Sequence, residues 1–245
     1  MGNLAELYGF EGKYAQAEPV YRQVVNGLER LEGKADHDTL MMTEGLAWTY
    51  DQEGKYGQAD ALYSEVLEAE ERVLGKDHPQ TLITMTDMAA SYFRRDMYEQ
   101  AEGLLVQALN GRRRKLGAGH PDTLATMGDL GWLYVTEGRH TEAEPLFSEA
   151  AKEFKKAGSD DWQRYRTISG LGASLAGQGQ YEKAEPLLVD GYQKMVERKA
   201  TIPVYLLGAL GQSTQAILKL YRGWGKPEKT NEWQKKFRED KETAP

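Results

Sequence analysis

The sequence predicts an all-α fold, a solenoid of antiparallel helix hairpins, because three motifs recur together along the chain. The first motif starts at Gly12, Gly54, Asp96, Gly138 and Gly179 and reads GKYAQAEPVY, GKYGQADALY, DMYEQAEGLL, GRHTEAEPLF and GQYEKAEPLL. The second precedes each copy as LAELY, LAWTY, MAASY, LGWLY or LGASL, and the third joins units as LEGKADHDTL, LGKDHPQTL and LGAGHPDTL. Successive copies of the first motif are 41 or 42 residues apart, and self-similarity at such a period indicates stacked repeats.

Each unit is predicted to be two amphipathic helices joined by a tight turn. In the second unit, apolar residues occur at helical spacing over residues 40–50 and again over residues 59–67. Gly54 supplies the turn between these helices, and Gly75 follows the second helix where a left-handed cap is common. A single hairpin cannot bury its apolar face, so neighbouring hairpins must stack around a shared core.

The repeats are expected to fill a single solenoid over residues 1–245, with five to six units. We assign repeats to about 1–33, 34–75, 76–117, 118–158 and 159–200, followed by a degenerate repeat and capping helix over 201–245. Within this last part, a helix is expected from Pro203 to Trp224. The sequence EWQKKFREDKE then predicts a polar terminal helix, docked by Trp233 and Phe237. Because NLAELY already belongs to a first helix, we expect a fragment that starts inside a repeat.

Composition narrows the classes of function. The chain is 40% hydrophobic and 28% charged, which is typical of a soluble, core-forming protein. It has no cysteine, which excludes disulfides and thiolate chemistry. The net charge of −7 opposes nucleic-acid binding, since such proteins usually present a basic face to phosphates. Neither a membrane span nor a signal peptide is evident, so we expect a cytoplasmic protein that binds no membrane.

Motifs that would indicate catalysis, a metal or a cofactor are not found, so we expect none of the three and no enzyme. His37, His78 and His120 recur on the loops between units. Packed helices lie about 8–10 Å apart, whereas zinc needs all its ligands within about 2.3 Å, so these histidines are interpreted as structural. The chain also has neither a Walker A phosphate-binding motif nor the motifs of a protein kinase.

The pattern of Leu, small residue and Tyr in the first helix, with Ala and an aromatic residue in the second, resembles the tetratricopeptide repeat. The 42-residue unit with LGKDHPQTL, GKY and EAEPL is similar to the kinesin light chain type of this repeat, which is also found in bacterial regulatory proteins. The resemblance covers residues 1 to about 200. It implies a right-handed superhelix whose first helices line a concave groove that binds a protein or peptide.

First-helix positions that the core does not use are the candidate partner-binding residues: Asn3, Glu44, Trp48, Asp51, Asp87, Arg94, Asp129, Trp132 and Arg166. The N-terminal and central parts of this set offer carboxylates beside two tryptophans, and the C-terminal part is basic. We therefore expect a charge gradient and a basic or amphipathic peptide as partner. Asn3 matches the groove asparagines of kinesin light chain-like proteins, whereas Gly45, Asp87, Asp129 and Gly170 replace the others.

Two alternative functions stay open. The chain is also consistent with the regulatory repeat region of a larger bacterial signalling protein, a serine/threonine kinase or an NTPase, that contacts its own catalytic domain. The segment LYRGWGKPEKTNEW from Leu218 resembles the tail that closes such repeat regions in some bacterial kinases. The third possibility is a structural scaffold whose end helices stack one subunit on the next. The oligomeric state stays open.

Overall fold

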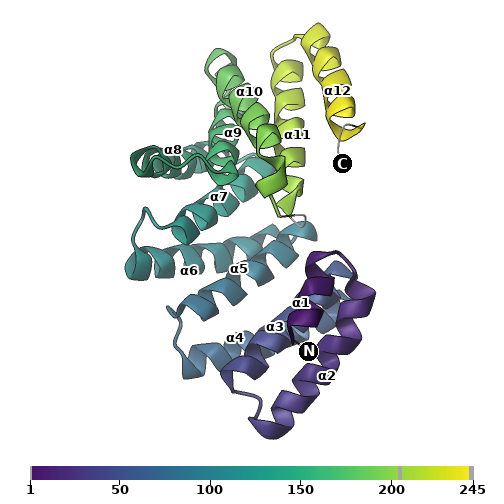
Figure 1. The fold of residues 1–245 in the computed structure, drawn as a ribbon. Coiled ribbons are helices and arrows are strands. Elements are labelled where there is room, and N and C mark those ends of the chain that lie inside the picture. The colour runs from purple at the N-terminus through teal and green to yellow at the C-terminus, as the bar shows by residue number, and fades with distance from the viewer. Residues whose placement is uncertain (1, 204–205, 243–245) are drawn as a thin grey trace. The chain divides into compact units, whose positions relative to one another are not determined.

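The computed structural model describes residues 2–203 and 206–242, and the chain divides into two compact units, Met1–Gly117 and Ala118–Pro245. Within the described residues, the regular structure consists of twelve α-helices and one short 3-10 helix (Figure 1). Consecutive helices pair as antiparallel hairpins, so the prediction of an all-α solenoid of helix hairpins is confirmed.

Unit 1 contains three hairpins. They are α1 (Gly2–Phe10) with α2 (Tyr14–Leu31), α3 (His37–Gln52) with α4 (Tyr56–Val73), and α5 (Pro79–Arg94) with α6 (Tyr98–Leu116). The first helices of consecutive hairpins also contact one another, α1 with α3 and α3 with α5. Their side chains therefore meet across hairpins as well as within them.

Unit 2 contains three further hairpins. They are α7 (Pro121–Thr136) with α8 (His140–Ala157), α9 (Trp162–Gly177) with α10 (Tyr181–Glu197), and α11 (Gly208–Gly223) with α12 (Pro227–Glu242). A short 3-10 helix, Lys199–Thr201, follows α10. As in unit 1, the first helices are neighbours, since α9 contacts both α7 and α11.

The C-terminal part differs from the prediction at one point and agrees at another. The helix expected from Pro203 begins only at Gly208, because Ile202 is buried in a cluster with Trp162 and Met195 and the chain there fills the core. Residues 204–205 lie outside the described residues. The docking of α12 is confirmed: Trp233 and Phe237 are buried, with ring centroids 5.9 and 5.0 Å from that of Tyr192 on α10.

The turns and caps explain several of the recurring residues. Gly54 has φ 75°, and Asp96 adopts a similar φ of 59° where the other copies of the motif carry glycine. The backbone N–H groups of Gln80 and Asp122 each donate to the Nδ1 atom of the histidine two residues before, at 3.2 Å. His78 and His120 are therefore helix N-caps. His37 lies one residue after its cap, Asp36, so it does not have the same position as the other two.

Two large side chains on second helices, Phe147 and Tyr21, pack against glycines of the first helices. In unit 2, Phe147 of α8 lies against Gly131 of α7 and Gly170 of α9; a Cβ built on these glycines would approach the ring to 2.6 and 2.3 Å. In unit 1, Tyr21 of α2 packs in the same way on Gly45 of α3, where the closest approach would be 2.5 Å. These contacts set how near the first helices approach one another.

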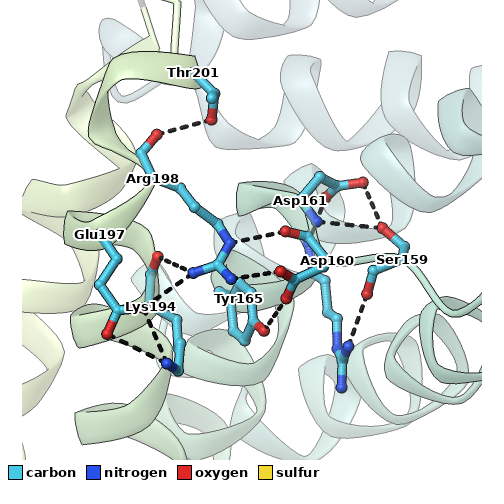
Figure 2. Close-up of polar contacts among 9 residues, drawn as sticks. Ser159, Asp160, Asp161, Tyr165, Lys194, Glu197, Arg198 and Thr201 are labelled. Carbon is cyan, nitrogen blue, oxygen red and sulfur yellow. Dashed lines mark hydrogen bonds and ion pairs between the residues drawn. The ribbon is translucent and has the colours of Figure 1, made fainter.

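A polar clamp fixes the loop between α8 and α9 to the end of α10 (Figure 2). The Arg198 guanidinium donates to the Asp160 carbonyl oxygen at 2.8 Å and to its carboxylate at 2.6 Å, and it lies 4.6 Å above the centre of the Tyr165 ring. The Tyr165 hydroxyl donates to the same carboxylate. The Tyr165 hydroxyl and Arg198 together lower the pKa of Asp160. In unit 1, Arg114 binds Asp77 across the equivalent loop at 2.6 Å.

Substitution of Gly170 by alanine should test the packing around Phe147. We expect Gly170→Ala to destabilise the protein by about 1–3 kcal/mol, because the added methyl group overpacks a filled core. Gly211→Ala in α11 is the matched control, since nothing lies within 4 Å of its Cβ and alanine favours a helix by up to about 1 kcal/mol. Urea unfolding followed by circular dichroism measures both, and equal stabilities would contradict the packing argument.

Candidate partner-binding face

Exposed side chains of the first helices form a surface on each unit, which we call the first-helix face. In unit 1 this face comprises exposed or half-buried side chains from α1, α3 and α5: Asn3, Met41, Trp48, Ile83, Thr86, Asp87, Ala90 and Arg94. Because these helices contact one another, the residues belong to one surface. The predicted candidates Asn3, Trp48, Asp87 and Arg94 are part of it.

Two large apolar side chains are exposed on this face at equivalent positions. Met41 on α3 is 37% exposed and Ile83 on α5 is 39% exposed, and they are 42 residues apart. Ile83 was not among the predicted residues. The repeat spacing from Met41 was the signal that would have identified it. Together with Ala90, these residues give the face an apolar component.

Three predicted partner-binding residues are buried, so the expectation that they face a partner is wrong. Glu44 is 9% exposed, Asp51 is 3% exposed and Trp132 is 3% exposed. The first helix of the following hairpin packs against each of the helices that carry them, and its side chains bind both carboxylates. Trp132 is covered within unit 2, where its ring meets that of Phe147 edge-on at 5.9 Å.

Trp48 is half-buried, and its ring packs against neighbouring side chains and backbone of unit 1. Its ring lies edge-on to that of Tyr14, with centroids 5.5 Å apart, and a Cβ on Gly9 would lie 2.8 Å from it. The predicted pair of exposed tryptophans is therefore corrected to one half-buried indole in unit 1.

The structure pairs predicted anions with predicted cations. In unit 1, buried Asp51 accepts hydrogen bonds from Ser91 and Arg94 of the next first helix, and the Arg94 side chain stays 43% exposed. In unit 2, Arg166 donates to Asp129 at 2.7 Å, and here the carboxylate is the exposed partner at 44%. The exposed member of the pair is therefore the cation Arg94 in unit 1 and the anion Asp129 in unit 2. This is the reverse of the predicted gradient, which runs from acidic at the N-terminal end to basic at the C-terminal end.

A second set of contacts places two carboxyl groups on one hydroxyl. Thr84 Oγ1 lies 2.8 Å from Glu44 Oε1 and 2.7 Å from Glu70 Oε2, and Gln80 Nε2 donates to Glu44 Oε2 at 2.7 Å. Burial, followed by the charge of Asp87, raises the pKa of Glu44 to about 8. Burial also raises the pKa of Glu70. We call Glu44, Glu70 and Thr84 the carboxyl bridge.

Two further buried polar groups lie in this part of unit 1, the Tyr63 hydroxyl and the guanidinium of Arg112, which donates to Thr86 Oγ1 at 3.4 Å. Tyr63 of α4 is fully buried, and its hydroxyl has no hydrogen-bond partner among the described residues. Burial, and then the charges of Asp87, Asp51 and Glu44, raise its pKa well above the ordinary value. The charge of Arg94 acts in the opposite direction but is the smaller effect, so the hydroxyl stays protonated.

Other features of the described residues carry no assignment. The carboxylates of Glu32, Asp36 and Asp38 lie within 4.8 Å of one another, but Asp36 already accepts the N-cap hydrogen bond of α3 and the group is an acidic cluster at an inter-helix loop. In the part of the chain that the structure describes, no helix is both long enough and apolar enough to cross a membrane.

Hairpins of antiparallel helices, stacked through glycine and aromatic contacts, define a helical-repeat protein. The tetratricopeptide repeat profile matches residues 1–69, 52–114 and 87–156, and the chain belongs to the tetratricopeptide repeat family. Modules of this family generally mediate protein–protein interactions and are typically non-catalytic.

Solved structures with the same fold include kinesin light chain-like and bacterial proteins. The nearly identical TPR-like repeats of a kinesin light chain from Podosopora anserina give a TM-score of 0.69 at 23% identity, over 80% of this chain and 93% of that one. BtubC (BKLC) from P. vanneervenii gives 0.70 at 23% identity, over 79% and 78%. A Rap protein complexed with competence and sporulation factor gives 0.63 at 16% identity, over 96% and 72%. No curated protein sequence matches the chain.

The raised pKa of Glu44 predicts that unit 1 loses stability as pH rises. The carboxyl group is protonated in the folded state up to about pH 8, but in the unfolded chain only up to its ordinary value near 4.5. Its contribution to the free energy of unfolding is therefore complete below pH 4.5, declines as pH rises from there, and is lost above about pH 8. Glu44→Gln should remove this decline, with a gain of a few kcal/mol at pH 9, since a tenfold change in proton affinity corresponds to about 1.4 kcal/mol.

Hydrogen exchange of the α3 and α5 amides in wild type and Glu44→Gln between pH 5 and 9, corrected for intrinsic exchange rates, measures this difference. Glu68→Gln, at an exposed position of α4, is the control. A constant difference between wild type and Glu44→Gln at every pH would contradict the assignment.

Proposed function

We propose that this chain is a protein-interaction module that binds a basic or amphipathic peptide segment on the first-helix face of unit 1. The observation that carries the proposal is the exposure of Met41 and Ile83 at the same position of consecutive first helices, on the face that also contains Asp87. An apolar pair of this kind suits the apolar side chains of an amphipathic segment, and the carboxylate suits its cationic ones.

Among the residues of this face, the charged ones are the Asp87 carboxylate and the Arg94 guanidinium. Arg94 is bound by Asp51, so its charge is compensated within the protein. Asp87 lies close enough to Glu44 and Tyr63 to raise the pKa of both. Asn3 is exposed on α1 and carries an amide suited to bonding a peptide backbone.

A structural neighbour supports the use of this architecture for ligand binding. The Rap protein of similar fold was solved in complex with competence and sporulation factor, so a protein with this fold forms such a complex. The kinesin light chain-like neighbours support the same repeat type, and their identity of 22–23% supports the fold alone.

A second candidate function is assembly through α1. Leu4 and Leu7 are exposed on this helix, whereas their equivalents 42 residues later, Leu46 and Thr49, are buried. The occupant of this surface would be a second copy in a scaffold, or another domain of a larger signalling protein. Analytical ultracentrifugation at rising concentration separates these readings, since a constant monomer mass would exclude self-assembly.

The proposed function predicts selective capture of basic peptides. We expect an array of basic, neutral and acidic amphipathic peptides to show binding of the basic members, weakened at high salt because added ions screen exposed charges. Ile83→Asp and Asp87→Lys should each weaken binding by about tenfold, or about 1.4 kcal/mol.

Fluorescence anisotropy of labelled peptides measures these affinities. Val106→Asp and Glu68→Lys are the controls, because they make the same changes at exposed positions of the second helices α6 and α4. If the first-helix variants keep their fold by circular dichroism and bind the peptides with unchanged affinity, the proposal is wrong.

A further inference from the structure

Within each unit, the groove between the two helices of a hairpin is closed by the end of the next first helix. In unit 1, Lys55 follows α3 and donates to the Glu18 carboxylate of α2 at 2.6 Å. Arg95 follows α5 and donates to both carboxylate oxygens of Asp60 on α4, at 2.8 and 3.0 Å. In both hairpins, a donor from the incoming helix end binds a carboxylate of the second helix.

Unit 2 repeats this arrangement. Glu144 of α8 accepts from the side-chain amide of Gln178, just after α9, and Glu185 of α10 accepts from the Tyr221 hydroxyl of α11, both at 2.7 Å. Each of the four acids is the fifth residue of its helix. We call them the inter-hairpin carboxylates: Glu18, Asp60, Glu144 and Glu185.

The groove between α11 and α12 is open and has the opposite polarity. It contains a hollow of about 320 Å³, lined by residues of these two helices and of the turn between them. The fifth residue of α12 is Asn231, at the position of the inter-hairpin carboxylates. Arg222 follows Tyr221 in α11, whereas in α3 the residue after the equivalent Tyr50 is Asp51. At both positions, a carboxylate of an earlier groove is therefore replaced.

Two cations line this hollow without an acidic partner. Arg222 is exposed and Lys226 is half-buried, and in the part of the chain that the structure describes neither forms an ion pair with a carboxylate. The Lys226 ammonium nitrogen lies 3.1 Å from the centre of the Trp224 ring. Both acids that act on the lining tyrosine are engaged, Glu185 by its hydroxyl and Glu232 by a lysine at 3.3 Å. The hollow thus presents positive charge that the protein does not compensate.

The outer side of α12 limits what can occupy the groove. Where α2 has the buried Tyr21 and Val25, α12 has Gln234 and Arg238. A further apolar hairpin, or the apolar side of α1 from a second copy, would bury these polar groups without gaining an apolar contact. Glu228, in the first turn of α12, is exposed and does not line the hollow. The groove therefore suits a short helix end that is held by charge.

We propose that this hollow binds the last turn of a partner helix through a carboxylate, held by Arg222, Lys226 and the Asn231 amide. The incoming helix enters as the ends of α3, α5, α9 and α11 enter the earlier grooves, with the direction of charge reversed. The negative end of its dipole then points toward the two cations, which adds to the attraction. The site belongs to unit 2 and takes an acidic segment, so it goes beyond the function proposed for the first-helix face of unit 1.

Two helical peptides test the proposal. Both are amphipathic and built from alanine, leucine and glutamine, and the last turn carries two glutamates in one peptide and two lysines in the other. Fluorescence anisotropy measures their binding to the full chain. We expect wild type to bind the glutamate peptide, more weakly at high salt because added ions screen exposed charges. Arg222→Glu and Asn231→Glu should each weaken this binding by about tenfold, the second because it restores an inter-hairpin carboxylate.

Two control variants accompany these measurements. Lys155→Glu, at an exposed position of α8 in the same unit, makes the matched change of charge outside the hollow. Ile83→Asp should weaken binding of the lysine peptide to unit 1 and leave binding of the glutamate peptide unchanged. Arg222 and Asn231 are both exposed, so their variants should keep the fold, which circular dichroism checks.

The outcomes separate this inference from the proposed function. Weaker binding of the glutamate peptide in Arg222→Glu and Asn231→Glu, with Lys155→Glu unchanged, supports the inference. It is overturned if wild type does not bind the glutamate peptide at low salt, or if Arg222→Glu binds it as tightly as wild type does. Neither result bears on the function proposed for unit 1, which depends on basic peptides and on Ile83.

Discussion

The close approach of consecutive first helices is the constraint on which the rest of this structure depends. Glycines allow it: Gly45 accommodates Tyr21 in unit 1, and Gly131 and Gly170 accommodate Phe147 in unit 2. Once the first helices are this near, polar side chains on neighbouring ones reach each other. Thr84 reaches Glu44, Arg166 reaches Asp129, and Ser169 donates to Ser213 at 2.8 Å. The packing thus determines which groups remain for a partner.

The repeat period was enough to predict the helices and their pairing, because turn glycines, small residues and core aromatics all follow it. Two details were not accessible in this way. Asp96 adopts the conformation of a turn glycine although its residue type does not require it, and the chain before α11 fills the core through Ile202. Both depend on tertiary contacts that a periodic pattern does not contain.

The sequence predicted which first-helix positions belong to the candidate site, but it did not predict which of those side chains are exposed. Counting along a first helix finds the residues that point away from its own hairpin, and Asn3, Asp87 and Arg94 were found in this way. The same count included Glu44, Asp51 and Trp132, which the adjacent helices cover. Exposure depends on how far the side chains of the next hairpin reach. Asp51 is buried because both Ser91 and Arg94, about one repeat later, extend to it.

The carboxyl bridge is not a requirement of the repeat architecture. At the positions equivalent to Glu70, the chain has Leu28 one repeat before, the buried Arg112 one repeat after and Phe154 two repeats after, and one repeat after Glu44 it has Thr86. Each of these packs in a first or second helix without a buried acid. Burying a carboxyl group opposes folding unless it is neutralised or paired, so two adjacent buried acids reduce stability at neutral pH. This reduction of stability is confined to one pair of hairpins beneath the first-helix face of unit 1. Groups with strongly shifted pKa values occur at functional sites more often than elsewhere, which supports the proposed location of the binding face.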